Sequence, residues 1–127
     1  MLRSTEITTA VCAGFVFAGI ATSTAARAED APRSYVASPD VYKVIGTVGK
    51  ARVILATRQP GQRDQPHSHP PGLLYVLTPC KGGNHIAGNV RTGSSEAGKI
   101  VTFPHVESHW VENVGTTECK ELIVEEE

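Results

Sequence analysis

Glycine and proline divide this sequence into short apolar runs, and that division limits the folds open to the chain. Turn signals of this kind recur from Gly46 to Gly115, and no segment between them carries a sustained helical repeat. We expect strands at residues 41–48, 51–58, 73–77, 99–103, 110–114 and 120–125, and a weaker pair of strand segments around residues 85–90. Many short strands with frequent turns indicate an all-β sandwich or barrel.

Two of these segments differ in how deeply they are expected to lie. Residues 51–58 are apolar on both faces, which suits a strand buried inside a barrel. Residues 120–125 alternate in a similar but half-exposed way, so we expect them to cover an edge of the core. The acidic run Glu125-Glu126-Glu127 is interpreted as a solvated tail.

The first 28 residues have the pattern of a secretory signal peptide. Arg3 precedes an uncharged apolar run from Ala10 to Ile20, and Ala26-Arg27-Ala28 fits the rule for the cleavage site. The alternative is an uncleaved anchor, although the apolar run is short for a mature membrane span. We expect a periplasmic or secreted protein without membrane attachment after cleavage. An unfolded export route would deliver the chain to metals outside the cytoplasm, which argues against iron.

Cleavage would leave 99 residues, enough for one small domain. These residues hold 10 lysines and arginines against 12 aspartates and glutamates, a balance that does not suggest nucleic acid or a membrane surface as a partner. Residues 29–40 are polar and contain two prolines, so we expect an N-terminal arm that is loosely held unless a partner orders it. The domain itself should span residues 41–127.

Cys80 and Cys119 are the only cysteines outside the signal segment. An exported compartment allows them to form a disulfide, which would close a loop of about forty residues and stabilise the domain by roughly 3–4 kcal/mol. Two separate buried thiols are the alternative.

The spacing of two histidines suits the binding of one metal ion. His67 and His69 point to the same face of an extended chain, while Ser68 points away. Two ring nitrogens on one face are suited to binding one ion. A third ligand must come from elsewhere, and the best candidate is His109. The alternative for each is an ordinary polar surface histidine.

These two histidine stretches resemble the two motifs of the cupin superfamily. In order, the matching residues are Gly61, His67 and His69 in the first motif and Gly98, Pro104, His109 and Asn113 in the second. Residues 38–45 and 111–118 also look like short, single-domain bacterial cupins. The resemblance implies a double-stranded β-helix, the cupin jelly-roll barrel, with a mononuclear metal inside it. It also implies that Cys80 and Cys119 lie on neighbouring antiparallel strands, and that the protein forms a homodimer through its N-terminal strands.

The first motif departs from the cupin pattern where a glutamate ligand is expected. Leu73 or its neighbours stand there instead, and Val106 replaces a glycine of the second motif. The remaining site resembles that of three-histidine cupins, such as the thiol dioxygenases, which hold iron for oxygen chemistry. His85 or His105 is a possible replacement for the glutamate, or either is an ordinary histidine. Glu107 and Glu112 are interpreted as solvated, and Glu107 is the better candidate of the two for orienting a histidine ring.

Three neutral imidazoles suit one divalent transition metal (Zn, Fe, Cu, Ni or Mn) better than Mg or Ca. Without a carboxylate ligand the ion keeps its +2 charge, which favours anionic substrates or a bound hydroxide. Metal affinity should fall below about pH 6.5, where free imidazole becomes protonated. We read Tyr75, Phe103 and Trp110 as core or pocket wall, and Gly61, Gly98, Pro104 and Asn113 as formers of turns.

Two functions remain open from the sequence. The first is a metal-dependent enzyme, oxygenase-like or related, that acts on a small molecule at open coordination positions; the catalytic residues are unknown. The second is a non-catalytic cupin of the cell envelope that binds a metal or a small ligand. An enzyme should leave open positions and an accessible mouth, whereas a metal carrier should close its ligand sphere. A decayed site on an intact scaffold is a third alternative.

Overall fold

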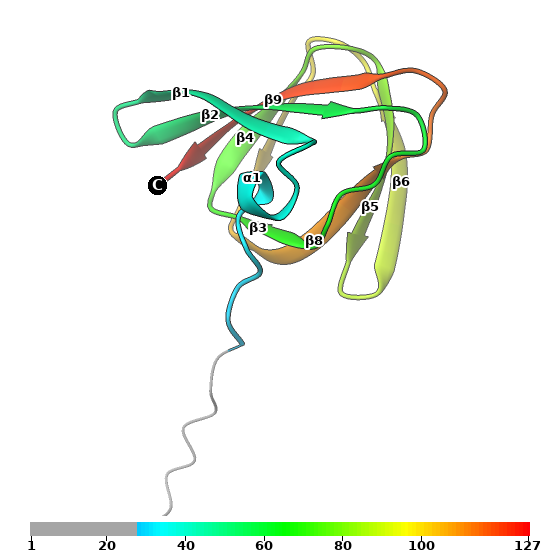
Figure 1. The fold of residues 1–127 in the computed structure, drawn as a ribbon. Coiled ribbons are helices and arrows are strands. Elements are labelled where there is room, and N and C mark those ends of the chain that lie inside the picture. The colour runs from blue at the N-terminus through cyan, green and yellow to red at the C-terminus, as the bar shows by residue number, and fades with distance from the viewer. Residues whose placement is uncertain (1–27) are drawn as a thin grey trace, which may run out of the picture.

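The computed structural model describes residues 28–127, so the predicted signal segment lies outside the described residues apart from Ala28. This part of the chain forms one short helix, α1 (Ser34–Ala37), and nine strands (Figure 1). The strands are β1 (Tyr42–Val48), β2 (Ala51–Arg58), β3 (His67–His69), β4 (Gly72–Val76), β5 (Cys80–Ile86), β6 (Asn89–Ser95), β7 (Ile100–Phe103), β8 (Val106–Asn113) and β9 (Cys119–Glu126). Over residues 28–127, no helix is long and apolar enough to span a membrane.

The strands form two antiparallel sheets that enclose a common interior (Figure 1). The larger sheet has the order β1-β2-β9-β4-β7 and the smaller one the order β3-β8-β5-β6. From β2 to β9 the chain passes back and forth between the sheets, apart from the β5–β6 hairpin within the smaller sheet, so it winds as a double-stranded β-helix. The all-β jelly-roll prediction is therefore confirmed.

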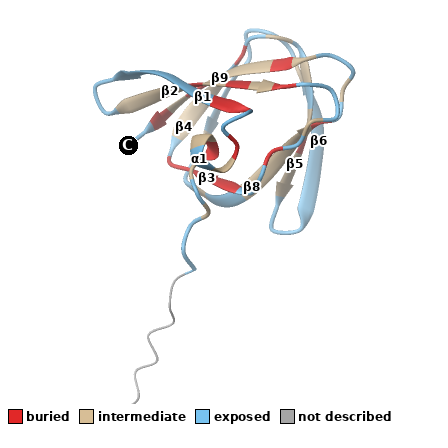
Figure 2. Cartoon of the chain, in the orientation of Figure 1, coloured by how far each residue is buried: buried red, intermediate tan, exposed pale blue. Residues whose placement is uncertain are grey.

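The core lies on the inner face of the larger sheet. Ile54 and Ala56 of β2 pack there with Ile123 of β9, and Val41 and Tyr42 complete the buried cluster. Figure 2 shows buried residues also in β3, whose three residues are all buried. The outward residues of β2 are half-buried, so this strand alternates instead of being buried equally on both faces.

The weak strand signal at residues 85–90 proves to be the end of a longer hairpin. β5 and β6 pair along their whole length, from Cys80 opposite Ser95 to Ile86 opposite Asn89. The two residues between them, Ala87 and Gly88, both have positive φ, 48° and 78°, as tight two-residue hairpin turns require.

The prediction that the segment 120–125 covers an edge of the core is wrong. β9 lies between β2 and β4; it pairs with β2 along its whole length and with β4 from Glu121 to Glu125. Gly72 permits the close approach of β4, since a Cβ atom there would lie 2.5 Å from the carbonyl oxygen of Val124. Tyr75, which we expected in the core or pocket wall, is 39% exposed on β4.

The N-terminal arm is held more firmly than its sequence suggests. The Ala31 amide donates to the Glu107 carbonyl at 3.0 Å, and the Ser68 amide donates to the Pro32 carbonyl at 2.9 Å. Ser34 is fully buried, so this segment covers the free edge of β3. For this reason Ser68, although it points away from the other two residues of β3, is buried as well.

Cys80 and Cys119 form a disulfide with their Cα atoms 5.0 Å apart, as predicted. The resemblance implied neighbouring antiparallel strands, but Cys80 begins β5 of the smaller sheet and Cys119 begins β9 of the larger one. Beyond the end of β4 at Val76, the Leu77 amide still donates to the Lys120 carbonyl at 2.9 Å. The chain after β4 therefore stays beside the start of β9 and brings the two cysteines together. A structural disulfide is characteristic of oxidising compartments.

Candidate metal centre

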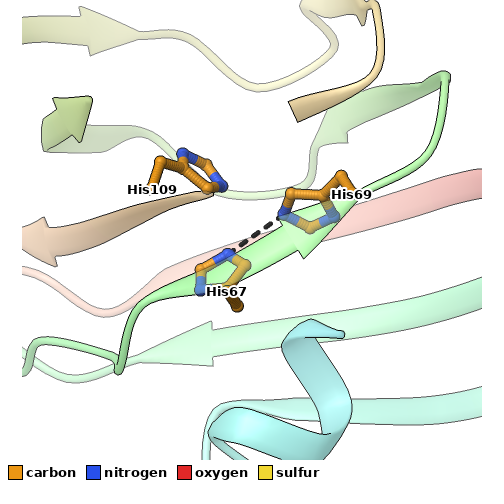
Figure 3. A group of neighbouring side chains, drawn as sticks. All are labelled: His67, His69 and His109. Atoms are coloured by element: carbon orange, nitrogen blue, oxygen red, sulfur yellow. Dashed lines mark hydrogen bonds between the residues drawn. The ribbon is translucent and has the colours of Figure 1, made fainter. Parts of the chain in front are cut away.

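The pairing of β3 with β8 brings the predicted histidines together. His67 lies directly opposite His109 in the register of this pair, and directly opposed residues project from the same face. His69 follows two residues later on that face. The structure thus gathers His67, His69 and His109, with one nitrogen of each ring within 4.8 Å of the others (Figure 3).

Hydrogen bonds fix which nitrogen of each ring faces this centre. The Nδ1 atom of every ring faces an oxygen: Gln65 O at 2.7 Å from His67, Glu125 Oε2 at 2.8 Å from His69, and Asn84 Oδ1 at 2.9 Å from His109. Since these oxygens accept, each Nδ1 carries the hydrogen of the neutral ring. Each Nε2 is then left with a lone pair.

The three Nε2 atoms converge, and none of them carries a hydrogen to donate to another. Nε2 of His67 lies 3.0 Å from Nε2 of His69, and Nε2 of His109 is buried with no hydrogen-bond partner among the described residues (Figure 3). Burial, more than any other cause, lowers the pKa of His67 to about 4 and that of His109 to about 3. These two rings are therefore neutral at physiological pH. Three neutral imidazoles facing one point could bind a metal ion, and this donor set fits a transition metal.

Glu125 is the main functional residue that the sequence interpretation missed. It is 1% exposed, so its assignment to a solvated tail is wrong. Its Oε2 accepts from His69, while Oε1 is buried without a partner among the described residues. Glu107, interpreted as solvated with ring orientation as its alternative role, is exposed. The missed signal was periodicity: Glu125 follows the buried Ile123 by two residues and shares its face.

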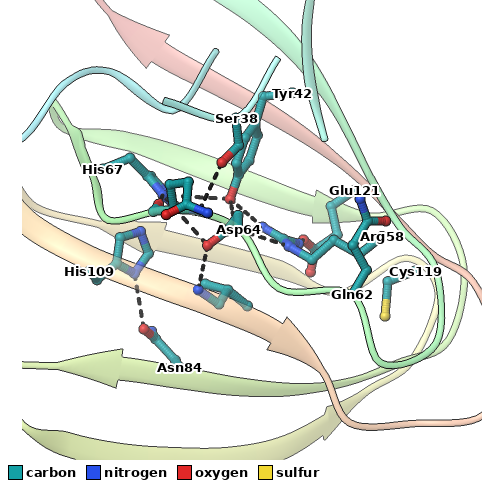
Figure 4. Close-up of polar contacts among 12 residues, drawn as sticks. Ser38, Tyr42, Arg58, Gln62, Asp64, His67, Asn84, His109, Cys119 and Glu121 are labelled. Carbon is teal, nitrogen blue, oxygen red and sulfur yellow. Dashed lines mark hydrogen bonds and ion pairs between the residues drawn. The ribbon is translucent and has the colours of Figure 1, made fainter. Parts of the chain in front are cut away.

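A second buried network lies beside His67 and was also missed (Figure 4). The Tyr42 hydroxyl donates to Oδ2 of Asp64 at 2.6 Å and lies 3.2 Å from Nε2 of His67. Arg58 donates to the same carboxylate oxygen through Nε and Nη2, at 3.1 and 3.0 Å, and also to the Tyr42 hydroxyl. Burial raises the pKa of Tyr42, so the phenol keeps its proton and directs it to Asp64.

Asp64 anchors this network to the rest of the site. Its Oδ1 accepts from the Val111 amide at 2.7 Å and lies 3.7 Å from Nδ1 of His67. Arg58 has a second carboxylate partner, because its Nη1 donates to Glu121 at 2.9 Å. These contacts fix the backbone of β8 to one buried carboxylate, which lies beside the ring of His67.

A cavity of about 980 Å³ lies next to the histidines. His69 and His109 form part of its wall, and most of the remaining wall is apolar: Leu74, Val101, Phe103, Val106, Trp110 and Ile123. Exposed residues at 86–88, 104, 105, 107 and 108 line its rim, so the cavity opens to solvent. As predicted, Phe103 and Trp110 belong to the pocket wall.

His85 and His105 do not join the three gathered nitrogens. The His85 ring stacks on Trp110 with centroids 3.4 Å apart, and its Nε2 lies 3.1 Å from a carboxylate oxygen of Glu112. Nε2 of His105 faces Asp30 at 3.0 Å on the surface. Glu112 is therefore a partner of His85 and not simply solvated.

The turn-forming residues of the two motifs have the expected structural roles. Gly61 and Gly98 adopt positive φ angles of 77° and 88°. The buried Asn113 amide donates to the carbonyls of Arg58 and Thr117 at 3.1 and 2.7 Å, which secures the turn after β8.

Comparison with solved structures decides the fold family. A cupin domain from Bordetella pertussis Tohama I superposes with a TM-score of 0.64 at 18% identity, covering 79% of this chain and 99% of that one. The chain has the cupin fold. No family model matches the sequence. No curated protein matches it either.

Two further structures agree with this cupin assignment. A double-stranded β-helix protein from Klebsiella pneumoniae has a TM-score of 0.56 at 21% identity and covers 68% of this chain and 75% of its own. A cupin-like protein from Thermotoga maritima MSB8 has a TM-score of 0.54 at 26% identity over 67% of this chain and 66% of its own. The resemblance drawn from the two histidine motifs is thus confirmed at the level of the fold.

Proposed function

We propose that this cupin binds one divalent transition-metal ion through Nε2 of His67, His69 and His109 and acts as a metal-dependent enzyme on a small molecule. The convergence of three ring nitrogens beside an open cavity carries the proposal. A bound divalent ion supplies Lewis acidity, which polarises an oxygen atom of a substrate or activates water.

The surrounding residues prepare the three rings for this role. Gln65, Asn84 and Glu125 each accept the Nδ1 hydrogen of one ring and so select the tautomer whose Nε2 faces the centre. Outer partners of this kind set ring orientation and raise the basicity of the ligand. The open cavity favours an enzyme over a metal carrier, since His85 and His105 are engaged elsewhere and do not complete a ligand sphere.

A non-catalytic ligand-binding cupin is the second candidate. Tyr42, Arg58 and Asp64 are the polar groups nearest to the histidines besides their Nδ1 partners, and they satisfy one another. None of them offers a proton that is free for transfer to a substrate. Because the hydrogen-bonding groups of this network are used within it, the network favours ligand binding without catalysis.

We also propose that the protein is exported and forms a homodimer. The disulfide and the predicted signal segment support export. For the dimer, β1 is an edge strand that exposes Val44, Ile45 and Val48, by 44, 55 and 73%. Light scattering of the wild type and of a Val48→Glu variant tests this: a dimer that the variant converts to a monomer would support it.

The metal site is tested by elemental analysis after stripping and reloading with zinc, cobalt or iron. We expect about one equivalent in the wild type and a loss of at least tenfold in affinity for His109→Ala, because one of three ligands is removed. His105→Ala is the matched control on the same β7–β8 segment. Equal metal binding by wild type and His109→Ala, with both folded by circular dichroism, would contradict the proposed site.

Cobalt also separates an enzyme-like site from a carrier. Open coordination positions should let azide or thiocyanate change the visible spectrum of the cobalt-loaded protein. A spectrum that stays unchanged at saturating concentrations of either ion would indicate a closed ligand sphere and favour the carrier.

A further inference from the structure

We infer that the cavity binds a neutral, largely apolar molecule with a hydrogen-bond donor, and discriminates against anions. This inference rests on the proposed metal site and names its class of ligand. If only the charges of the metal ion and its three histidine ligands are considered, a site without a carboxylate would favour anions. The groups behind the ligands reverse that expectation.

Three carboxylates and one guanidinium surround the histidines. Glu125 lies 2.8 Å from His69, and Asp64 lies 3.7 Å from His67; both are 1% exposed. Glu121 is bound to Arg58 at 2.9 Å and is largely covered. With Arg58 as their one counter-charge, these groups leave a net charge of −2, which one divalent ion would neutralise. A neutralised site has no surplus charge with which to attract an anion.

The cavity wall offers no cation of its own to an anion. Arg58 is the one arginine or lysine among the described lining residues, and its donors are directed to Asp64, Glu121 and Tyr42. Carboxylate and phosphate groups are normally received by arginine or lysine donors. The rim adds negative charge through the exposed Glu107. An entering anion would therefore meet the Glu107 carboxylate before it reaches the metal ion, and the buried carboxylates beyond that ion.

The apolar lining of the cavity suits the apolar part of a ligand, and the Tyr42 hydroxyl suits a hydrogen-bond donor on that ligand. The apolar side chains of the cavity surround a volume in the range of small-molecule sites. Tyr42 lines the same cavity, and its only hydroxyl hydrogen is directed to Asp64. Its oxygen already accepts from Arg58, so its remaining lone pair can only accept from a ligand. An apolar ring or chain with a hydroxyl group satisfies both surfaces.

A pair of probes that differ mainly in charge tests this inference. We expect 2-naphthol, measured by calorimetry at pH 7.5, to bind zinc-loaded protein at least tenfold more tightly than 2-naphthoate. The comparison is demanding, because a carboxylate is intrinsically the better ligand for a divalent ion. Tighter or equal binding of 2-naphthoate would overturn the inference, and so would the absence of binding by both probes.

Glu125→Gln tests the electrostatic cause directly. The amide oxygen still accepts from His69, but one buried negative charge is removed. The preference for 2-naphthol over 2-naphthoate should then fall by about tenfold, whereas Glu126→Gln, one residue away and exposed, should leave it unchanged. An unchanged preference in Glu125→Gln would show that buried charge does not set the selectivity.

The two proposals fail in different ways. Zinc content is measured in the same samples, and its absence would end the metal proposal. Without the ion the buried charge stays at −2, so metal-free protein should reject 2-naphthoate even more strongly. Selective binding of 2-naphthol by metal-free protein would support the present inference independently.

Discussion

Acid should destabilise the metal-free protein through His67. Burial lowers the pKa of this ring to about 4 in the folded protein, whereas the ring has an ordinary pKa of about 6.5 when unfolded. Between these values the unfolded state binds a proton that the folded state does not. Stability is therefore complete above about pH 6.5 and is lost as the pH falls toward 4.

The size of this effect follows from the difference of about 2.5 pKa units. At about 1.4 kcal/mol per unit, His67 should cost about 3 kcal/mol once the pH is below 4, of which about 2 kcal/mol is already lost at pH 5. His109, whose pKa is lowered to about 3, adds to the loss with the same sign.

Urea unfolding measures this loss, with chelator present and the fluorescence of the single tryptophan, Trp110, as the probe. Because other groups also titrate, the test is a comparison of wild type with His67→Asn between pH 7.5 and 5. The wild type should lose about 2 kcal/mol more than the variant. His105→Asn, on the surface, should follow the wild type. Parallel curves for wild type and His67→Asn would refute the reasoning.

Three further predictions concern stability. Asp64→Asn removes one of the two carboxylates paired with the buried Arg58 guanidinium and should lower the free energy of unfolding by about 3 kcal/mol, the lower end for breaking a buried ion pair; a loss below about 1 kcal/mol would contradict a structural role. Cys80→Ser/Cys119→Ser should unfold in urea with about 3–4 kcal/mol less stability, and equal midpoints would exclude a stabilising bridge. Gly72→Ala brings a methyl group onto a backbone oxygen of β9 and should cost more than about 2 kcal/mol, whereas Gly93→Ala, with open space, should not. Equal melting temperatures for these two variants would show that β4 and β9 can separate without cost.

The fold was predictable because its signals are local. Turn residues recur along the chain, and the two histidine stretches carry the spacing of the cupin motifs. The pairing of β5 with β6 was harder to see, because the strands contain polar residues and glycines, with Gly82 opposite Gly93. Such segments become strands through their partners and not through their own propensity.

The three histidines were predictable, but the residues that hold them were not. Glu125 reaches His69 only because β9 pairs in one register between β2 and β4, and a shift of one residue would turn it outward. Tyr42, Arg58 and Asp64 come from separate segments, and none has a distinctive spacing. Contacts of this kind depend on long-range pairing that a single sequence does not display.

The central place of β9 has a consequence for how fast the protein can fold. β2 and β4 meet no common partner until β9 enters between them, and the pairing of Ala51 with Glu126 joins residues far apart in the chain. The chain must lose the entropy of closing such large loops before any contact stabilises it. Folding is therefore slow, on the scale of milliseconds to seconds. During that interval β2 and β4 present open edges to other chains, so the yield of refolding should fall steeply with protein concentration.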